Sequence, residues 1–184
     1  MKDFERNGKR LAVRGAKECA YLAVFVALVI AVQLCLAVVP GVELVTVLFV
    51  SYAFVFGIKR GLISATAFSL LRQLLFGFSP TVLILYLVYY NALALAFGCI
   101  GRAVKDPLRA LWWIVLFTCL CTVCFSMLDN IITPLWYGYT KRATRAYFIA
   151  SLSFMLPQLV CTAVSVGILF IPLQRAFKSI KKGL

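Results

Sequence analysis

Histidine is absent from this chain of 184 residues, and acidic side chains are scarce, with six Asp and Glu against 19 Lys and Arg. The lack of histidine removes the commonest acid–base group and metal ligand of proteins. No G-x-x-x-x-G-K-[ST] motif occurs, so the chain cannot itself bind ATP through a P-loop. Charged residues make up only 14% of the sequence, whereas soluble domains carry about 25%. The sequence therefore predicts neither a soluble domain nor chemistry that depends on histidine.

Seven cysteines are present, and two of them, Cys121 and Cys124, form a C-x-x-C pair with Cys119 nearby. A structural zinc ion needs four nitrogen or sulfur ligands, and no second ligand pair accompanies this one. All three thiols lie inside an apolar run, where cysteine is an ordinary small packing residue. We therefore predict no metal site and no cofactor.

Long apolar runs account for most of the sequence, which is 64% hydrophobic. A helix needs about 20 apolar residues to cross the hydrocarbon core of a bilayer. Gly, Pro and charged residues separate the runs, which predict spans at about 18–39, 43–57, 61–76, 81–101, 109–132 and 146–173. The second and third runs are short, which predicts tilted or bent helices whose irregular backbone is buried in protein. We expect Pro157 to break the last span and Pro172 to end it.

Basic residues collect in one set of gaps between these runs. The tails at about 1–17 and 174–184, with the gaps at 59–60 and 102–109, hold 15 of the 19 Lys and Arg. Because Lys and Arg collect on the cytoplasmic side of membrane helices, both termini are expected inside the cell. The predicted fold is one all-α integral membrane domain covering residues 1–184, with six transmembrane helices and cytoplasmic N- and C-termini.

A smaller basic group runs against this rule. Lys141, Arg142 and Arg145 fall in the outward loop predicted at 133–145. The net charge of +13 could also suggest nucleic acid, but the charges flank spans and form no basic face among aromatic residues. Anionic lipid headgroups explain the charge better, so we expect membrane lipid and no nucleic acid as a partner.

Few ionisable side chains lie within the predicted spans, where one costs at least about 2.5–3.5 kcal/mol. Glu43 begins the second span, Arg72 lies late in the third, and Asp129 lies near the end of the fifth. By the predicted topology all three fall in the outer half of the membrane, which indicates a pocket open to the outside. The alternative is a set of interfacial residues with one Arg–carboxylate pair joining two helices. For Asp129, simple contact with water is an equal explanation.

Amides and aromatic rings extend this set. Asn91, Asn130 and Gln158 are amides inside the fourth, fifth and sixth spans. Aromatic residues also gather at the outer face, where an interfacial belt explains many of them. Tyr86 and Trp136 lie closest to the predicted pocket mouth, and they are the candidates for stacking on a planar heteroaromatic ligand.

A stripe of small residues follows the first span. Ala23, Ala27 and Ala31 recur at four-residue spacing, and Ala16 and Ala20 extend the same face. Such a stripe lets another helix approach closely. The spacing alone does not distinguish packing inside this chain from an interface with a partner protein.

Three segments resemble the substrate-binding S components of energy-coupling factor (ECF) vitamin importers. They are residues 40–46 (PGVELVT), 56–61 (FGIKRG) and 76–80 (FGFSP), and the likeness extends from the first span through Arg102. The later part is similar only in the number of spans. The resemblance implies a multi-pass protein of the bacterial cell membrane that binds a vitamin or related micronutrient from outside. It also implies partners, namely a membrane coupling subunit with two cytoplasmic ATPases, on which S components dock and topple to release substrate inward.

The resemblance also implies residue roles. S components dock through an Ala-x-x-x-Ala stripe on the first span, which Ala23, Ala27 and Ala31 match. Their ligands lie between the outer loops and the outer ends of spans four to six. The substrate-binding candidates in this chain are Glu43, Arg72, Tyr86, Asn91, Asp129, Asn130, Trp136 and Gln158. None of them matches a substrate-defining motif, so the vitamin is not specified.

A solitary small secondary transporter is the alternative function. Such a carrier needs a coupling-ion site near the midplane of broken helices, and Asn91 and the Pro157-Gln158 pair are the only hints of one. An intramembrane enzyme would need a nucleophile with a base, or clustered carboxylates on a metal. The scattered acidic residues supply neither, so we predict no enzymatic activity.

Overall fold

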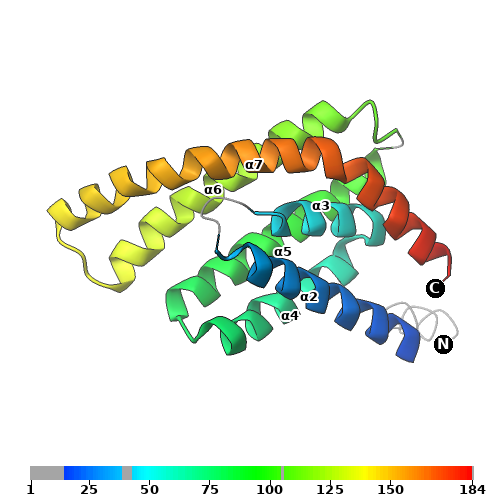
Figure 1. Ribbon diagram of the computed structural model, residues 1–184, viewed down its shortest axis with the longest axis horizontal. Coiled ribbons are helices and arrows are strands. Elements are labelled where there is room, and N and C mark those ends of the chain that lie inside the picture. Colours follow the sequence, from blue (N-terminus) through cyan, green and yellow to red (C-terminus); the bar gives the residue numbers. More distant parts are fainter. Residues whose placement is uncertain (1–14, 39–42, 105, 184) are drawn as a thin grey trace, which may run out of the picture.

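The computed structural model describes residues 15–38, 43–104 and 106–183, and this part of the chain is built of helices (Figure 1). They are α2 (Ala16–Leu36), α3 (Val45–Phe56), α4 (Ile58–Phe76), α5 (Pro80–Ala103), α6 (Leu111–Trp136) and α7 (Lys141–Lys182). These helices coincide with the apolar runs, so the all-helical prediction is confirmed. Residues 40–42, which separate the first two predicted spans, and the N-terminal tail before Gly15 lie outside the described residues.

Four helices, α2, α5, α6 and α7, are long and apolar enough to cross a membrane. The protein is therefore a multi-pass helical membrane protein by the length and composition of its helices. Helix α3 has 12 residues, so it is about 18 Å long and shorter than a hydrocarbon core of about 30 Å. The prediction of a short second helix is confirmed. Helix α4 has 19 residues and follows α3 directly.

Helix α3 lies at the centre of the molecule (Figure 1). Each residue from Val45 to Val55 is buried, as expected of a helix that is apolar on all sides. Helices α5 and α7 are its main neighbours. The ring of Phe49 packs against the rings of Phe25 in α2, Phe68 in α4 and Tyr90 in α5. One buried side chain thus connects three surrounding helices through the central one.

A tight corner joins α3 to α4 at Gly57. The backbone there has a φ of +84°, a left-handed conformation that glycine adopts without a steric penalty. Helix α5 packs closely against this corner. A side chain at Gly101 would place its Cβ 2.1 Å from the carbonyl oxygen of Phe54, so only glycine fits there. The C-terminal end of α5 therefore packs directly against the backbone at the end of α3.

Proline does not interrupt the last helix, which is a correction to the sequence prediction. Helix α7 runs for 42 residues through both Pro157 and Pro172. Neighbouring groups and small adjustments can satisfy the backbone that proline leaves free in membrane helices, which explains why the helix continues. Figure 1 shows a bend toward its C-terminal part instead of a break. Helix α6 likewise includes Pro134, so the predicted loop at 133–145 shortens to residues 137–140.

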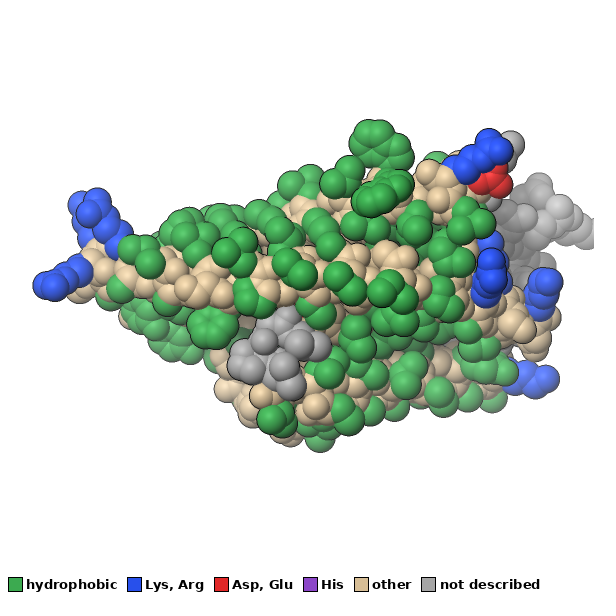
Figure 2. Space-filling view, turned by 45° about the horizontal axis from the view of Figure 1, so that its top comes forward, with side chains coloured by type: hydrophobic (Ala, Val, Ile, Leu, Met, Phe, Trp, Pro, Cys, Tyr) green, Lys and Arg blue, Asp and Glu red, His purple; other side chains and the backbone are tan. Residues whose placement is uncertain are grey.

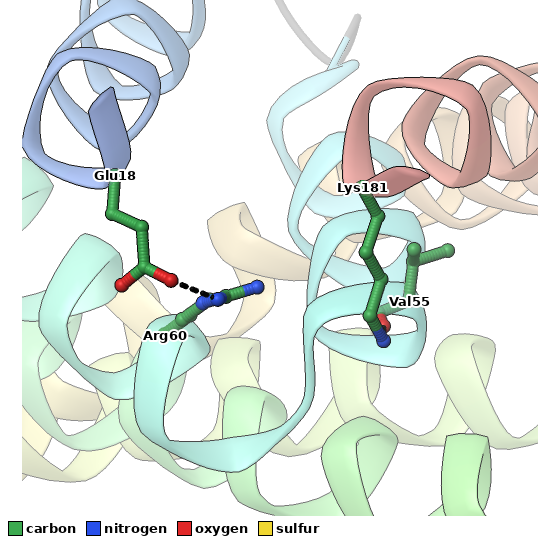
Figure 3. Close-up of polar contacts among 4 residues, drawn as sticks. All are labelled: Glu18, Val55, Arg60 and Lys181. Atoms are coloured by element: carbon green, nitrogen blue, oxygen red, sulfur yellow. Dashed lines mark hydrogen bonds and ion pairs between the residues drawn. The ribbon is translucent and has the colours of Figure 1, made fainter. Parts of the chain in front are cut away.

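The start of α2, the corner and the end of α7 meet at one end of the molecule, called here the tail end. Arg60, just after the corner, forms an ion pair with Glu18 in the first turn of α2. The ammonium of Lys181 donates a hydrogen bond to the carbonyl oxygen of Val55. Figure 3 shows both contacts around the same corner. The polar contacts at the tail end therefore connect three segments that are distant in sequence.

Basic side chains occupy both ends of the molecule. In the face that Figure 2 shows, Lys and Arg stand at the tail end and at the opposite tip, and hydrophobic side chains cover the region between them. The opposite tip is where α6 turns into α7, next to Lys141 and Arg142. An apolar belt between two charged ends is the surface that a bilayer requires.

Candidate functional site

Glu43 is the centre of a hydrogen-bonded cluster just before the first turn of α3. Its Oε1 accepts hydrogen bonds from the hydroxyl of Thr46 at 3.1 Å and from the phenol of Tyr90 at 3.0 Å. Its Oε2 accepts one from the amide nitrogen of Gln158 at 2.6 Å. The three donors come from α3, α5 and α7, and all of them are neutral. Three helices therefore converge on one carboxylate.

The backbone of Glu43 is also fixed in place. Its N–H donates to the sulfur of Cys161 at 3.4 Å, and that thiol lies 3.7 Å from the carbonyl oxygen of Glu43. A carboxylate at this position is favoured by the positive end of the α3 helix dipole. Cys161 on α7 therefore helps to hold the backbone of Glu43 in position.

Arg72 lies beside this cluster but is not joined to either carboxylate. Its guanidinium lies 4.4 Å from the ring centre of Tyr86 and 4.7 Å from that of Phe76. In the described part of the chain no Asp or Glu is within ion-pair distance of it, and its Nε is buried without a hydrogen-bond partner. Arg72 therefore does not form the Arg–carboxylate pair that was the alternative interpretation for it.

Tyr86 links Arg72 to the Glu43 cluster. Its ring lies 5.2 Å from that of Tyr90, the residue that donates to Glu43. Its hydroxyl accepts a hydrogen bond from the amide of Gln33 in α2 at 3.1 Å. Glu43 and Arg72 both lie about 20 Å from the α3–α4 corner along their helices, so the two opposite charges share one level.

A cavity of about 290 Å³ opens between α6 and α7, and Gln158, which donates to Glu43, forms part of its wall. Asp129 is in its wall, with one oxygen accepting from Thr133 at 2.8 Å and the other from the phenol of Tyr147 at 2.7 Å. Phe125 also lines the cavity and packs against the rings of Tyr86 and Tyr89. The cavity therefore borders the cluster around Glu43.

The remaining candidates have other contacts. Asn130 is buried and donates to the hydroxyl of Ser151 at 2.7 Å, while its own oxygen has no partner. Asn91 accepts from Thr66 at 3.3 Å and thereby joins α5 to α4. Trp136 is 55% exposed at the end of α6, as an interfacial residue would be. The structure thus joins Glu43 to Gln158 directly, and places Tyr86, Arg72 and Asp129 around them.

The alanine stripe of α2 faces outward. Ala23, Ala27 and Ala31 are exposed, and together with Leu71 and Leu74 of α4 they line an apolar groove of about 710 Å³. None of the other described helices, α3 to α7, covers the stripe. Gln33, on the same helix, is directed away from the groove and toward Tyr86.

Several residues of the site were not among the sequence candidates. Tyr90, Gln33 and Tyr147 each form a hydrogen bond to a candidate residue. Tyr90 and Gln33 are polar groups inside apolar runs, which is the signal that could have identified them. Tyr147 stands too close to the basic tip to be distinguished from an interfacial aromatic residue.

Comparison of the chain with protein-family models, with curated proteins and with solved structures finds no match. In the described part of the chain no three His, Cys, Asp or Glu side chains are grouped so that they could hold a metal ion. The arrangement is suited to binding, since it offers a carboxylate with neutral donors, a guanidinium on aromatic rings and a cavity next to both.

Proposed function

We propose that this chain is the substrate-binding subunit of an ECF-type importer of the bacterial cell membrane. It takes up a vitamin or related micronutrient from the end of the molecule opposite the tails. A membrane coupling subunit and two ATPases deliver the substrate to the cytoplasm, where both termini of the chain lie, and the six helices all contribute to the membrane domain.

The observation that carries this proposal is the double role of α2. One face of the helix lines the exposed alanine groove, while Gln33 on another face donates a hydrogen bond to the hydroxyl of Tyr86, whose ring packs against Arg72. A subunit that must report an occupied site to a partner needs both surfaces on rigidly connected elements. The outward-facing Ala23, Ala27 and Ala31 supply a flat surface for a helix of the coupling subunit.

A pair of tryptophan variants on α2 tests the docking role. Ala27→Trp places a large ring in the groove, whereas Leu28→Trp places the same ring on an exposed position of α2 outside it. We expect Ala27→Trp to abolish uptake and association with the coupling subunit while ligand binding remains. Leu28→Trp should leave both unchanged. Equal loss of binding and uptake in Ala27→Trp would contradict a docking role.

Native mass spectrometry of the gently purified protein tests the binding role directly. A co-purified vitamin or precursor would name the substrate.

Uptake assays in cells that lack the coupling module complete this test, because an S component should then show no ATP-driven uptake. A C-terminal fluorescent-protein fusion, which becomes fluorescent only when it stays in the cytoplasm, tests the orientation.

The solitary secondary transporter is less well supported. That function called for a broken helix near the membrane midplane, with Pro157 and Gln158 as the hint. Helix α7 is continuous at this point, and Gln158 donates to Glu43. Robust uptake by cells without any coupling module would nevertheless favour the carrier.

A further inference from the structure

The cavity between α6 and α7 has a carboxylate but no basic side chain in its wall. Of the nine residues that line it, Asp129 is the one with a charge. Its two oxygens accept hydrogen bonds from the hydroxyls of Thr133 and Tyr147, which are neutral. A carboxylate has about four lone-pair sites, so two remain for another donor. Asp129 is half-buried, and within the described residues no Lys or Arg forms an ion pair with it.

A second carboxylate lies behind the same cavity. Gln158 lines the cavity and uses its amide nitrogen to donate to Glu43 at 2.6 Å. The donors to Glu43 are neutral as well, so its negative charge is dispersed by dipoles and not neutralised. The cavity therefore lies next to two carboxylates.

Nearby basic residues do not neutralise the negative charge of Asp129 and Glu43 at the cavity. Arg72 is held against the rings of Tyr86 and Phe76 and does not line the cavity. Lys141, Arg142 and Arg145 are exposed at the tip, where salt screens them. Arg145 lies two positions before Tyr147, and residues two apart on a helix face different directions.

We propose that this cavity binds the positively charged nitrogen group of an organic ligand, with Asp129 as its counter-ion. The rings of Phe125, Tyr147 and Phe154 line the same space and would stabilise a cation further. The volume of about 290 Å³ is near the lower end of small-molecule sites, so it fits a small ligand or the cationic part of a larger one. This inference rests on the proposed function, because it assigns a chemical class to the substrate of that site.

Three probes that share a phenyl ring test the charge requirement. Benzylammonium, benzyl alcohol and benzoate differ mainly in charge, and each is added to the purified chain in detergent while thermal unfolding is recorded. We expect benzylammonium alone to raise the unfolding temperature. Asp129→Asn should weaken that binding by roughly tenfold or more, since it removes the counter-ion. Asp106→Asn is the matched control, because it makes the same change at an exposed position outside the cavity.

A second variant keeps the test decisive where Asp129→Asn fails to fold. Ala150 lines the cavity, so Ala150→Leu should fill it and abolish benzylammonium binding with no change of charge. The inference is overturned by equal stabilisation from benzyl alcohol or benzoate, by binding that persists in both cavity variants, or by no stabilisation from benzylammonium at millimolar concentration. An Asp129-dependent effect of Na⁺ over K⁺ without any effect of benzylammonium would replace it with an inorganic cation site.

The two proposals fail separately in these experiments. The probe assay uses the isolated chain and needs no coupling module. A charge-selective cavity in a chain that never associates with a coupling module would refute the importer role alone. A chain that associates and transports but prefers benzoate would refute the cation site alone.

Discussion

Charged side chains at the two ends of the short central helix α3 have different kinds of partners. At the tail end, Arg60 pairs with Glu18, and Lys181 donates to the carbonyl of Val55. At the other end, Glu43 accepts only from neutral groups, and Arg72 rests on aromatic rings. Cationic groups at the tail end thus meet an anion or a helix carbonyl, which stabilises the corner. The opposite end leaves its charges unneutralised by one another, which is the condition expected of a site that awaits a ligand.

The largest expected effect comes from removing the acceptor at the ligand end. Glu43→Ala leaves the buried donors of Thr46 and Tyr90, and that of Gln158, without their partner. Each buried donor left without an acceptor costs about 1–3 kcal/mol, so loss of the acceptor that Thr46 and Tyr90 share should lower the free energy of unfolding by about 2–6 kcal/mol. Unfolding in detergent micelles measures it. Glu43→Gln keeps one acceptor oxygen and should lose less, and a loss below about 1 kcal/mol in Glu43→Ala would contradict the cluster.

A single donor should matter less. Tyr90→Phe removes one hydrogen bond to a charged group, which contributes about 1.5–3 kcal/mol. Tyr137→Phe is the control, since Tyr137 is exposed between α6 and α7 and should change stability by less than about 0.5 kcal/mol. Equal effects of the two changes would show that the phenol of Tyr90 does not support Glu43.

Arg72 should separate stability from binding. Arg72→Met keeps an apolar stem and removes the charge, so the free energy of unfolding should fall by only about 0.5–2 kcal/mol, the range of a cation–π contact. If Arg72 contacts the ligand, affinity for the co-purified ligand should fall by roughly tenfold or more, because the variant lacks the guanidinium that makes the contact. Titration of the variant measures this, and unchanged affinity would assign Arg72 a packing role.

The smallest effect is expected at the tail end. The side chains of Arg60 and Glu18 are 31% and 16% exposed, so water and salt screen their pairing. A double-mutant cycle with Arg60→Ala and Glu18→Ala should give a coupling free energy below about 1 kcal/mol that decreases with salt. A coupling energy as large as the effect of Glu43→Ala would remove the contrast between the two ends.

Much of the fold was predictable from the sequence because apolar runs determine where membrane helices form. The run at 43–57 became α3, and the run at 81–101 became α5 with its bounds shifted by one or two residues. The helix ends predicted near proline were wrong, since Pro134 and Pro157 lie inside α6 and α7. Proline breaks helices in water more often than in a packed membrane domain.

The site was predictable only as a set of unusual residues. Glu43 and Gln158 could be chosen because polar groups are costly in spans, but their hydrogen bond joins positions 115 apart in sequence. The rotation of each helix decides which polar groups meet, and hydropathy does not fix rotation. For the same reason the sequence could not show that Asn91 faces Thr66 of α4 while its neighbour Tyr90 faces Glu43.

The length of α3 has an electrical consequence. If the α3–α4 corner lies at the inner edge of a hydrocarbon core of about 30 Å, the 18 Å or so of α3 places Glu43 inside that core and not at its outer surface. Moving one elementary charge through the full membrane potential changes its energy by about 2.3 kcal/mol per 100 mV. With the tail end in the cytoplasm, as proposed, a cation that enters from outside to the level of Glu43 crosses roughly a third of that potential. An inside-negative membrane would then favour its capture by about 0.8 kcal/mol per 100 mV, before any ATP is hydrolysed.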